Sequence, residues 1–202
     1  MFGKIINWYC DKTTKLFAYT IGYILFGIFF LLIIYFLGTN ISTQIISAIF
    51  IIGLIFSLLH RRGIKIPLFE KIIFIVEREH EKHFPGKAAL MFFLAAIVLL
   101  YFFRNEPELV LAGLSVQIFA DTAAALVGKS IGQHKILSKG HYTKTLEGTL
   151  ACFVVAFFIL LFFVSWEIAL VVAIITTIIE FAPINDNLVI PLGVAVALKL
   201  LL

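Results

Sequence analysis

The chain has 202 residues, of which 62% are hydrophobic and only 14% are charged, with a formal net charge of +4. A soluble domain carries about 25% charged residues, so this composition excludes an ordinary water-soluble protein and makes lipid the expected solvent. We predict one membrane domain over residues 1–202, surrounded by membrane lipids and without a nucleic-acid partner.

Seven hydrophobic segments follow in chain order, because about 17–25 apolar residues cross the hydrocarbon core. They are Leu16–Leu37, Ile41–Leu59, Ala88–Phe103, Glu108–Val127, Thr149–Ser165, Trp166–Ala182 and Asn187–Leu202. The first is too long for the apolar core of a cleavable signal peptide, so we expect it to be retained as a span. The predicted fold is all-α and polytopic, with about seven transmembrane helices.

The basic residues orient this topology. The region before the first segment, the 60–87 segment and the 128–148 segment together hold 14 of the 16 lysines and arginines, whereas the opposite side holds Arg104 and Lys199. Cytoplasmic loops carry an excess of Lys and Arg. We therefore predict that the N-terminus and both long loops face the cytoplasm and that the C-terminus faces away from it.

The 60–87 segment has the pattern of a helix at the membrane surface. Pro67 suits a first helical position, an apolar stripe follows it, and a charged run ends at Pro85-Gly86. We predict an interfacial helix with its charged end in water. Glu79, His80 and His83 in that run are more typical of a solvated helix end than of a metal site, because the ligand set is incomplete.

Three carboxylates lie in or beside the apolar segments. Asp121 is in the fourth, Glu180 is near the inner end of the sixth, and Asp186 precedes the seventh. A charge inside a span costs about 2.5–3.5 kcal/mol and marks a functional candidate. The predicted topology brings all three near the cytoplasmic face. They either form structural pairs with loop lysines or, at Asp121 and Asp186, hold Mg²⁺, which prefers a few carboxylates with phosphate oxygens.

The segment after Asp121 suits a polyphosphate. Small residues there let a backbone or a ligand approach closely, and lysines supply positive charge. The candidate nucleotide- or phosphate-binding residues are Gly128, Lys129, Gly132, Lys139, Lys144, Thr145, Glu147, Gly148 and, later, Asn187. Alternatively, the lysines only orient the chain and contact anionic lipid, and Asn187 caps the last helix. Gly128-Lys129-Ser130 lacks the strand and glycine-rich loop of a Walker motif.

Two stretches, Asp121–Gly132 and Lys144–Ala151, together resemble the signature of the CTP-dependent lipid-alcohol kinases. That family includes dolichol kinase, phytol kinase and CTP-dependent diacylglycerol kinase, and it is related to phosphatidate cytidylyltransferase. Glu180 and the segment Pro183–Pro191 are similar to the family's later Glu and Asp-Asn-x-x-x-Pro motif. The segment between Lys135 and Lys144 lacks a proline often found there. The chain also has fewer spans than eukaryotic dolichol kinases, so it represents the catalytic core, about residues 115–192.

The resemblance implies a kinase that transfers the γ-phosphate of CTP to a membrane alcohol of the dolichol or polyprenol type. Asp121, Glu180 and Asp186 would be the catalytic residues, with Mg²⁺ held by Asp121 and Asp186. The alternatives are a CTP-dependent diacylglycerol kinase, a cytidylyltransferase that makes a CDP-lipid, and, in another class, a small proton- or cation-coupled transporter. The transporter is disfavoured because the acids gather at one face rather than at the midplane.

Overall fold

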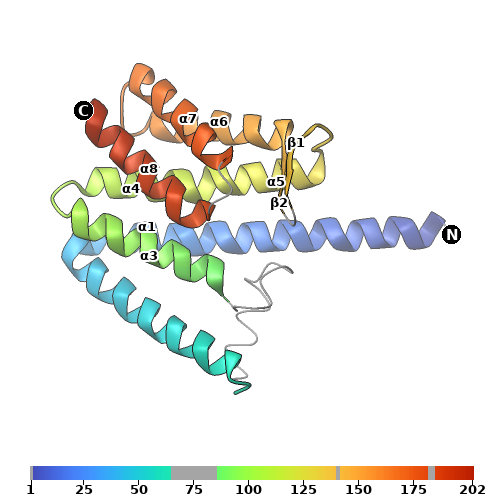
Figure 1. Ribbon diagram of the computed structural model, residues 1–202, viewed down its shortest axis with the longest axis horizontal. Coiled ribbons are helices and arrows are strands. Elements are labelled where there is room, and N and C mark those ends of the chain that lie inside the picture. Colours follow the sequence, from blue (N-terminus) through green and yellow to red (C-terminus); the bar gives the residue numbers. More distant parts are fainter. Residues whose placement is uncertain (1, 65–85, 140–141, 182–184) are drawn as a thin grey trace.

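The computed structural model describes the chain except for residues 1, 65–85, 140–141 and 182–184 (Figure 1). The protein is mostly helical, as expected. The helical elements are α1 (Phe2–Arg61), α3 (Lys87–Phe102), α4 (Pro107–Val116), the π-helix η1 (Gln117–Asp121), α5 (Thr122–Ser130), α6 (Leu146–Leu160), α7 (Trp166–Phe181) and α8 (Asp186–Leu201).

Most of each predicted apolar segment is helical, although α6 ends at Leu160, before the predicted end of the fifth segment at Ser165. The first two are the arms of α1, which bends at Gly38, where φ is 72° and ψ is 171°. A positive φ of this size is readily adopted only by glycine. The fourth segment is one unbroken helical rod, in which α4, η1 and α5 follow one another directly.

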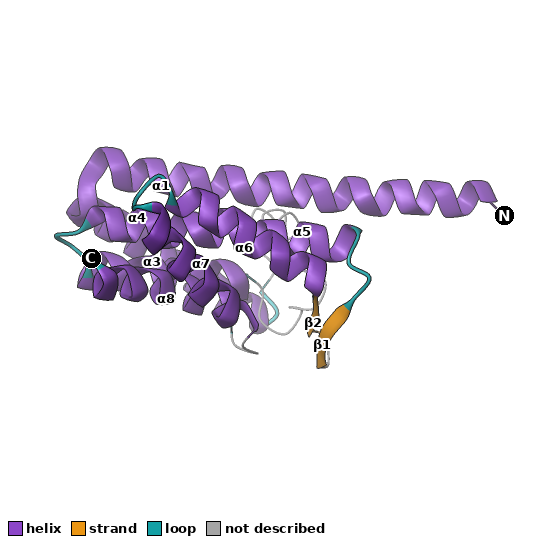
Figure 2. Cartoon of the chain, turned by 90° about the horizontal axis from the view of Figure 1, so that it is seen from above, coloured by secondary structure: helices purple, strands orange, loops and turns teal. Residues whose placement is uncertain are grey.

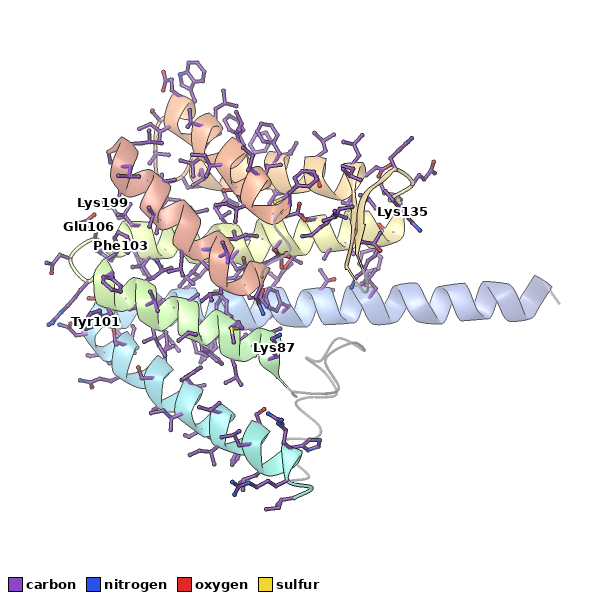
Figure 3. The ribbon with its side chains drawn as sticks, viewed as in Figure 1. Lys87, Tyr101, Phe103, Glu106, Lys135 and Lys199 are labelled. Atoms are coloured by element: carbon purple, nitrogen blue, oxygen red, sulfur yellow. The ribbon has the colours of Figure 1, made fainter. Side chains whose placement is uncertain are left out.

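The helices run back and forth between two ends of the molecule (Figure 1). The long α1 passes along the bundle, and α4, η1 and α5 run beside α6, α7 and α8. At one end, Lys199 Nζ of α8 lies 2.6 Å from Glu106 Oε1, next to the start of α4. Lys87 and Lys135 lie toward the other end, away from Lys199 and Glu106 (Figure 3).

The packing separates a central helix from a peripheral one. The apolar window of the rod Pro107–Ser130 is 67% buried inside the protein, whereas that of Thr20–Arg61 is only 17% buried. Large apolar side chains on α1 lie on the surface of the protein, including Phe29 (56% exposed) and Phe36 (73% exposed). Apolar surface this extensive is typical of a membrane-facing helix rather than of a soluble monomer.

Two helices in the described part of the chain meet the length and apolarity of a membrane span. These are Thr20–Arg61, with a mean hydropathy of 2.5, and Pro107–Ser130, with a mean hydropathy of 1.7. Lys87–Phe102 and Leu146–Leu160 are apolar but shorter. The architecture is therefore that of a helical, membrane-like protein, and the seven-span arrangement stays a prediction.

One element departs from the predicted all-α fold. A two-stranded antiparallel sheet, β1 (Lys135–Lys139) and β2 (Tyr142–Thr145), forms in the 128–148 segment, which we expected to be a loop. It lies between the end of α5 and the start of α6 (Figure 2). Leu137 pairs with Lys144, and the register shifts between Lys135 and Leu137. Ile, Tyr and Thr in these strands favour extended backbone.

The predicted interfacial helix lies outside the described residues, as do Glu79, His80 and His83. In the same way, Pro183 and Ile184 of the late motif are not described, although Glu180 before them and Asp186 after them are.

Candidate functional site

Lys144 is the centre of a charged cluster at the base of the β1–β2 hairpin. Its Nζ lies 2.5 Å from Glu180 Oε1 and 3.0 Å from Asp186 Oδ2. Strand β2 leads directly into α6, so the lysine is held at a fixed point between α6 and the facing ends of α7 and α8. Burial lowers the pKa of Lys144, but the charges and hydrogen bonds of Asp186 and Glu180 outweigh it, so the pKa lies above its ordinary value.

Glu180 is fixed at both carboxylate oxygens. Besides the contact of Oε1 with Lys144, Oε2 accepts a hydrogen bond of 3.3 Å from Thr149 Oγ1 on α6. The residue is 2% exposed and stands in the last turn of α7. A carboxylate engaged in this way is suited to holding Lys144 in place.

Asp186 begins α8 just before the predicted seventh span. Burial raises the pKa of its carboxyl to about 6, with the negative charge of Asp121 as the next cause, although Lys144 opposes both. Asp121 therefore lies close enough to Asp186 to repel it electrostatically. The two candidate metal ligands come from different helices, 65 residues apart in sequence.

Asp121 is 4% exposed and ends the π-helix η1. Gln117 Nε2 donates to Asp121 Oδ2 at 3.3 Å and to Asn187 Oδ1 at 2.6 Å. Since Asn187 directly follows Asp186, this one amide nitrogen connects η1 to the start of α8. π-helices are rare and are frequently found at functional sites.

Asn187 does not cap α8 with its side chain. The residue at the N-cap is Asn185, without a side-chain capping bond, whereas Asn187 Nδ2 donates to the carbonyl of Ala88 at 3.2 Å. Tyr23 OH also lies 3.4 Å from Asn187 Oδ1. Asn187 therefore joins α8 to α1, α3 and η1.

The small residues predicted on one face of α5 pack against α6. A Cβ at Gly148 would lie 2.8 Å from the carbonyl oxygen of Ala124 and 3.2 Å from the Cα of Gly128, and a Cβ at Gly132 would lie 2.6 Å from Thr145 Oγ1. We expected either a backbone or a ligand to lie against this face, and the structure has the backbone of α6 there. A role of these glycines in phosphate binding stays a prediction.

The first turn of α6 is capped by its own residues. Thr145 is the N-cap, and its Oγ1 accepts from the backbone N–H of Gly148 at 3.2 Å. The Glu147 carboxylate lies 2.7 Å from His134 Nδ1 and accepts from the backbone N–H of the same residue. The hydrogen bond with His134 is the main reason that the pKa of Glu147 falls to about 2. These contacts fasten β1 to α6.

The three lysines predicted to bind phosphate do not all lie in the charged cluster. Lys144 meets the acids, whereas Lys129 is an exposed residue in the last turn of α5. Lys139 belongs to β1, but its side chain lies outside the described residues.

Sequence reasoning missed three residues of the site: Gln117, Thr149 and Tyr23. Each is uncharged and belongs to an apolar helix, and each reaches the cluster through a contact that is distant in sequence. For Gln117, the one signal was an amide inside the otherwise apolar fourth segment, where a polar group is costly without a partner.

Gln117 is also incompletely paired. It is 0% exposed, and its Oε1 has no hydrogen-bond partner among the described residues. A buried acceptor without a partner costs about 1–3 kcal/mol, so the residue is not explained by stability alone.

The donor set fits a hard cation only with help from a ligand. Among the described residues, no three His, Cys, Asp or Glu side chains group closely enough to hold a metal by themselves. Mg²⁺, however, is usually bound by one or two carboxylates together with substrate phosphates and water. Asp121 and Asp186 supply carboxylate oxygens of that kind. Burial, and after it the charge of Asp121, raises the pKa of Asp186, and a cation would relieve the second of these two effects.

Comparison with known proteins gives one family. The family model described as the cytidylyltransferase family matches residues 7–191, a range that includes all the residues of this cluster. Neither the curated proteins nor the solved structures include a match to the chain.

Proposed function

Because this chain belongs to the cytidylyltransferase family, we propose that it is a CTP-using kinase that phosphorylates a membrane isoprenoid alcohol of the dolichol or polyprenol type. Family membership supports a CTP-related lipid enzyme in general. The kinase reaction, the alcohol and the Mg²⁺ requirement are our proposal.

The observation that carries the proposal is the contact of Lys144 with both Glu180 and Asp186. It brings the stretch Lys144–Ala151 together with Glu180 and Asp186 of the later motif, both of which resemble the lipid-alcohol kinases. The Lys144 ammonium has three donors, of which Glu180 and Asp186 accept two, so it can also donate to a phosphate oxygen. Phosphoryl transfer depends mostly on positioning and on charge stabilisation, so a small cluster of this kind is sufficient.

The charged residues of the cluster are Lys144, Glu180, Asp121 and Asp186, and their contacts give each a different role in this proposal. Glu180, engaged by Lys144 and Thr149, would orient the lysine toward the triphosphate. Asp121 and Asp186 would hold Mg²⁺ against the same phosphates. When bound, Mg²⁺ would supply positive charge to the phosphate oxygens. Gly128, Lys129, Gly132, Lys139, Thr145, Glu147, Gly148 and Asn187 stay candidates for the surrounding nucleotide site.

The reaction forms one P–O bond and breaks another. The hydroxyl oxygen of the lipid alcohol attacks the γ-phosphorus of CTP, the bond from that phosphorus to the β,γ-bridging oxygen breaks, and CDP leaves. The hydroxyl proton passes to a carboxylate. Glu180 and Asp121 are the two candidates for that acceptor.

The alcohol would reach the site from the bilayer. We propose that the hairpin end of the molecule faces the cytoplasm, with the substrate hydroxyl at the depth of the acids. A shallow apolar groove between α7 and α8 is suited to a hydrocarbon chain, and it begins at Gly193, about 10 Å along the helix from Asp186. Its lining residues are Ile175, Gly193, Val196, Ala197, Leu200 and Leu201.

A second candidate is favoured by the family match itself. A cytidylyltransferase would use the same CTP and cation but would join CMP to a lipid phosphate such as phosphatidate, releasing pyrophosphate. A diacylglycerol kinase differs from our first proposal only in its acceptor. The transporter is less favoured, because the family is enzymatic.

The position of a radiolabel distinguishes these reactions. Purified protein would be incubated with Mg²⁺ and CTP labelled at the γ- or the α-phosphate, together with polyprenol, dolichol, geranylgeraniol, phytol, diacylglycerol or phosphatidate. A kinase for isoprenoid alcohols transfers only γ-label, and only to those alcohols.

Asp121→Asn protein is the matched control for contaminating activity. Transfer of α-label to phosphatidate would replace the proposal by the cytidylyltransferase. Transfer of γ-label to diacylglycerol alone would change the acceptor. No transfer of either label to any lipid would overturn both enzymatic proposals.

A further inference from the structure

Gln117 stands between two parts of the candidate site. Its Nε2 donates to Asp121 Oδ2 at 3.3 Å and to Asn187 Oδ1 at 2.6 Å. In η1 the glutamine lies four residues before Asp121, so both side chains lie on neighbouring parts of one helical surface. A rotation of either side chain would break at least one of these two contacts.

The second partner of Gln117 is itself immobilised. Asn187 Nδ2 donates to the carbonyl of Ala88 at the start of α3, and Tyr23 OH of α1 lies 3.4 Å from Asn187 Oδ1. Gln117 thus donates to a side chain that belongs to α8 and contacts α3 and α1, and through its second contact it fixes the carboxylate of Asp121 relative to that side chain.

Stability alone does not account for this arrangement. Gln117 Oε1 is buried without a hydrogen-bond partner among the described residues, and an apolar side chain of the same length would avoid that penalty. The residue also begins the π-helix η1, a rare form that is frequently found at functional sites. A buried residue that keeps one polar atom unpaired is a candidate for a functional role.

We propose that Gln117 is a positioning residue that fixes the Asp121 carboxylate for the metal-bound triphosphate. The inference rests on the proposed function, because it assumes that Asp121 is a metal ligand. Gln117 acts through Asp121 and is not itself placed on the substrate. Groups that orient metal ligands typically change metal affinity or activity by about 10- to 100-fold when they are removed.

Binding of Mn²⁺, used in place of Mg²⁺, tests this without turnover. Free Mn²⁺ would be measured by electron paramagnetic resonance in the presence of CTP, for the wild type, Gln117→Met and Gln117→Asn. Methionine keeps the length but removes the donor. Asparagine keeps the amide but is one methylene too short to reach both acceptors. Gln44→Met, at an exposed position of α1, is the matched control.

We expect both Gln117 variants to bind Mn²⁺ at least about tenfold more weakly than the wild type. Their melting temperatures should stay close to that of the wild type, and Gln44→Met should bind Mn²⁺ as the wild type does. Wild-type affinity in a folded Gln117 variant overturns the inference. Weaker binding that only follows a loss of folded protein also overturns it, because the glutamine would then be structural. If the wild type itself binds no Mn²⁺ with CTP, the proposed function fails instead.

Discussion

Lys144 Nζ lies 2.5 Å from Glu180 Oε1, and this contact joins strand β2 to the last turn of α7. The side chain of the lysine is 15% exposed and that of the glutamate is 3% exposed. Water therefore screens the pair only weakly, and Glu180 without Lys144 would be an uncompensated buried charge.

Lys144→Met should lower activity by about 100-fold or more and should destabilise the protein by about 3 kcal/mol. The physical reason is that Glu180 and Asp186 lose their shared cation. Melting temperature and steady-state kinetics would be measured, with the exposed Lys135→Met in the same hairpin as the control.

Lys144→Arg separates the two effects. It keeps the positive charge, so we expect a folded protein with a raised KM for CTP, since the guanidinium is larger and planar. An unchanged kcat and KM in Lys144→Met would show that this lysine has no part in binding or catalysis.

Asp121→Asn should abolish activity, with a loss of at least about 100-fold, while the protein stays folded. The asparagine keeps the shape of the side chain and can still accept from Gln117 Nε2, and the change removes the negative charge that repels Asp186. Activity would be compared with the melting temperature of the same sample. Glu108→Gln, at an exposed position in the first turn of α4, should retain activity. Turnover in Asp121→Asn close to the wild-type level would contradict a metal role for this carboxylate.

Gly148→Ala should destabilise the protein by about 1–3 kcal/mol, because the new methyl group would lie 2.8 Å from the carbonyl oxygen of Ala124. Ala124 O and the Cα of Gly128, which lies 3.2 Å away, are backbone atoms of α5, so α5 and α6 must separate, and Lys144 must shift with them. Gly22→Ala in α1 is the control, since a Cβ there meets nothing within 4 Å. In a helix that change is neutral or stabilising, by up to about 1 kcal/mol. Equal melting temperatures for the two variants would show that the α5–α6 contact tolerates a side chain.

The sequence alone was sufficient to predict where the helices form and that the charged residues lie close together. Apolar length predicted where helices form, because a chain without polar surface must satisfy its backbone internally. The alternation of basic residues predicted which ends of the segments share a side. That reasoning placed Asp121, Glu180 and Asp186 near the 128–148 segment, and in the structure Lys144 of that segment contacts Glu180 and Asp186.

Three features escaped the same reasoning for physical reasons. The hairpin is short and lysine-rich, and its strands are recognised only once they pair. The π-helix η1 has no sequence pattern of its own. Gln117 is a neutral residue whose role depends on Asn187, 70 residues away, and a single sequence carries no sign of such a contact.

The Glu147 carboxylate should make the attachment of the hairpin sensitive to acid. Its pKa is lowered to about 2 from an ordinary value of 4.5, chiefly by the hydrogen bond with His134. A group with a lowered folded-state pKa stabilises the protein above its unfolded-state pKa, and that contribution disappears as the pH falls through the folded-state value. The contribution should therefore be complete above about pH 4.5 and should be lost between there and about pH 2.

The measurement compares melting temperatures of the wild type and Glu147→Gln over this pH range. We expect the wild type to melt higher above pH 4.5 and the difference to vanish toward pH 2. Glu167→Gln, an exposed residue in the first turn of α7, is the matched control. A difference that does not change with pH would show that the glutamine disturbs packing rather than the hydrogen bond with His134.

The proposed orientation in the membrane can be tested at two lysines. Lys135 lies by the hairpin and Lys199 lies at the other end of the molecule, next to Glu106 (Figure 3). If the hairpin faces the cytoplasm, Lys135→Cys should react with a membrane-impermeant maleimide only after the cells are opened. Lys199→Cys should react in intact cells. Cys10→Ser would serve as the background, since the other cysteine, Cys152, is buried. Labelling of both positions from the same side would rule out a bundle that crosses the bilayer between them. Labelling with the two sides exchanged would turn the acids and Lys144 away from the cytoplasm, where CTP is found, and the proposed kinase reaction would then have no donor.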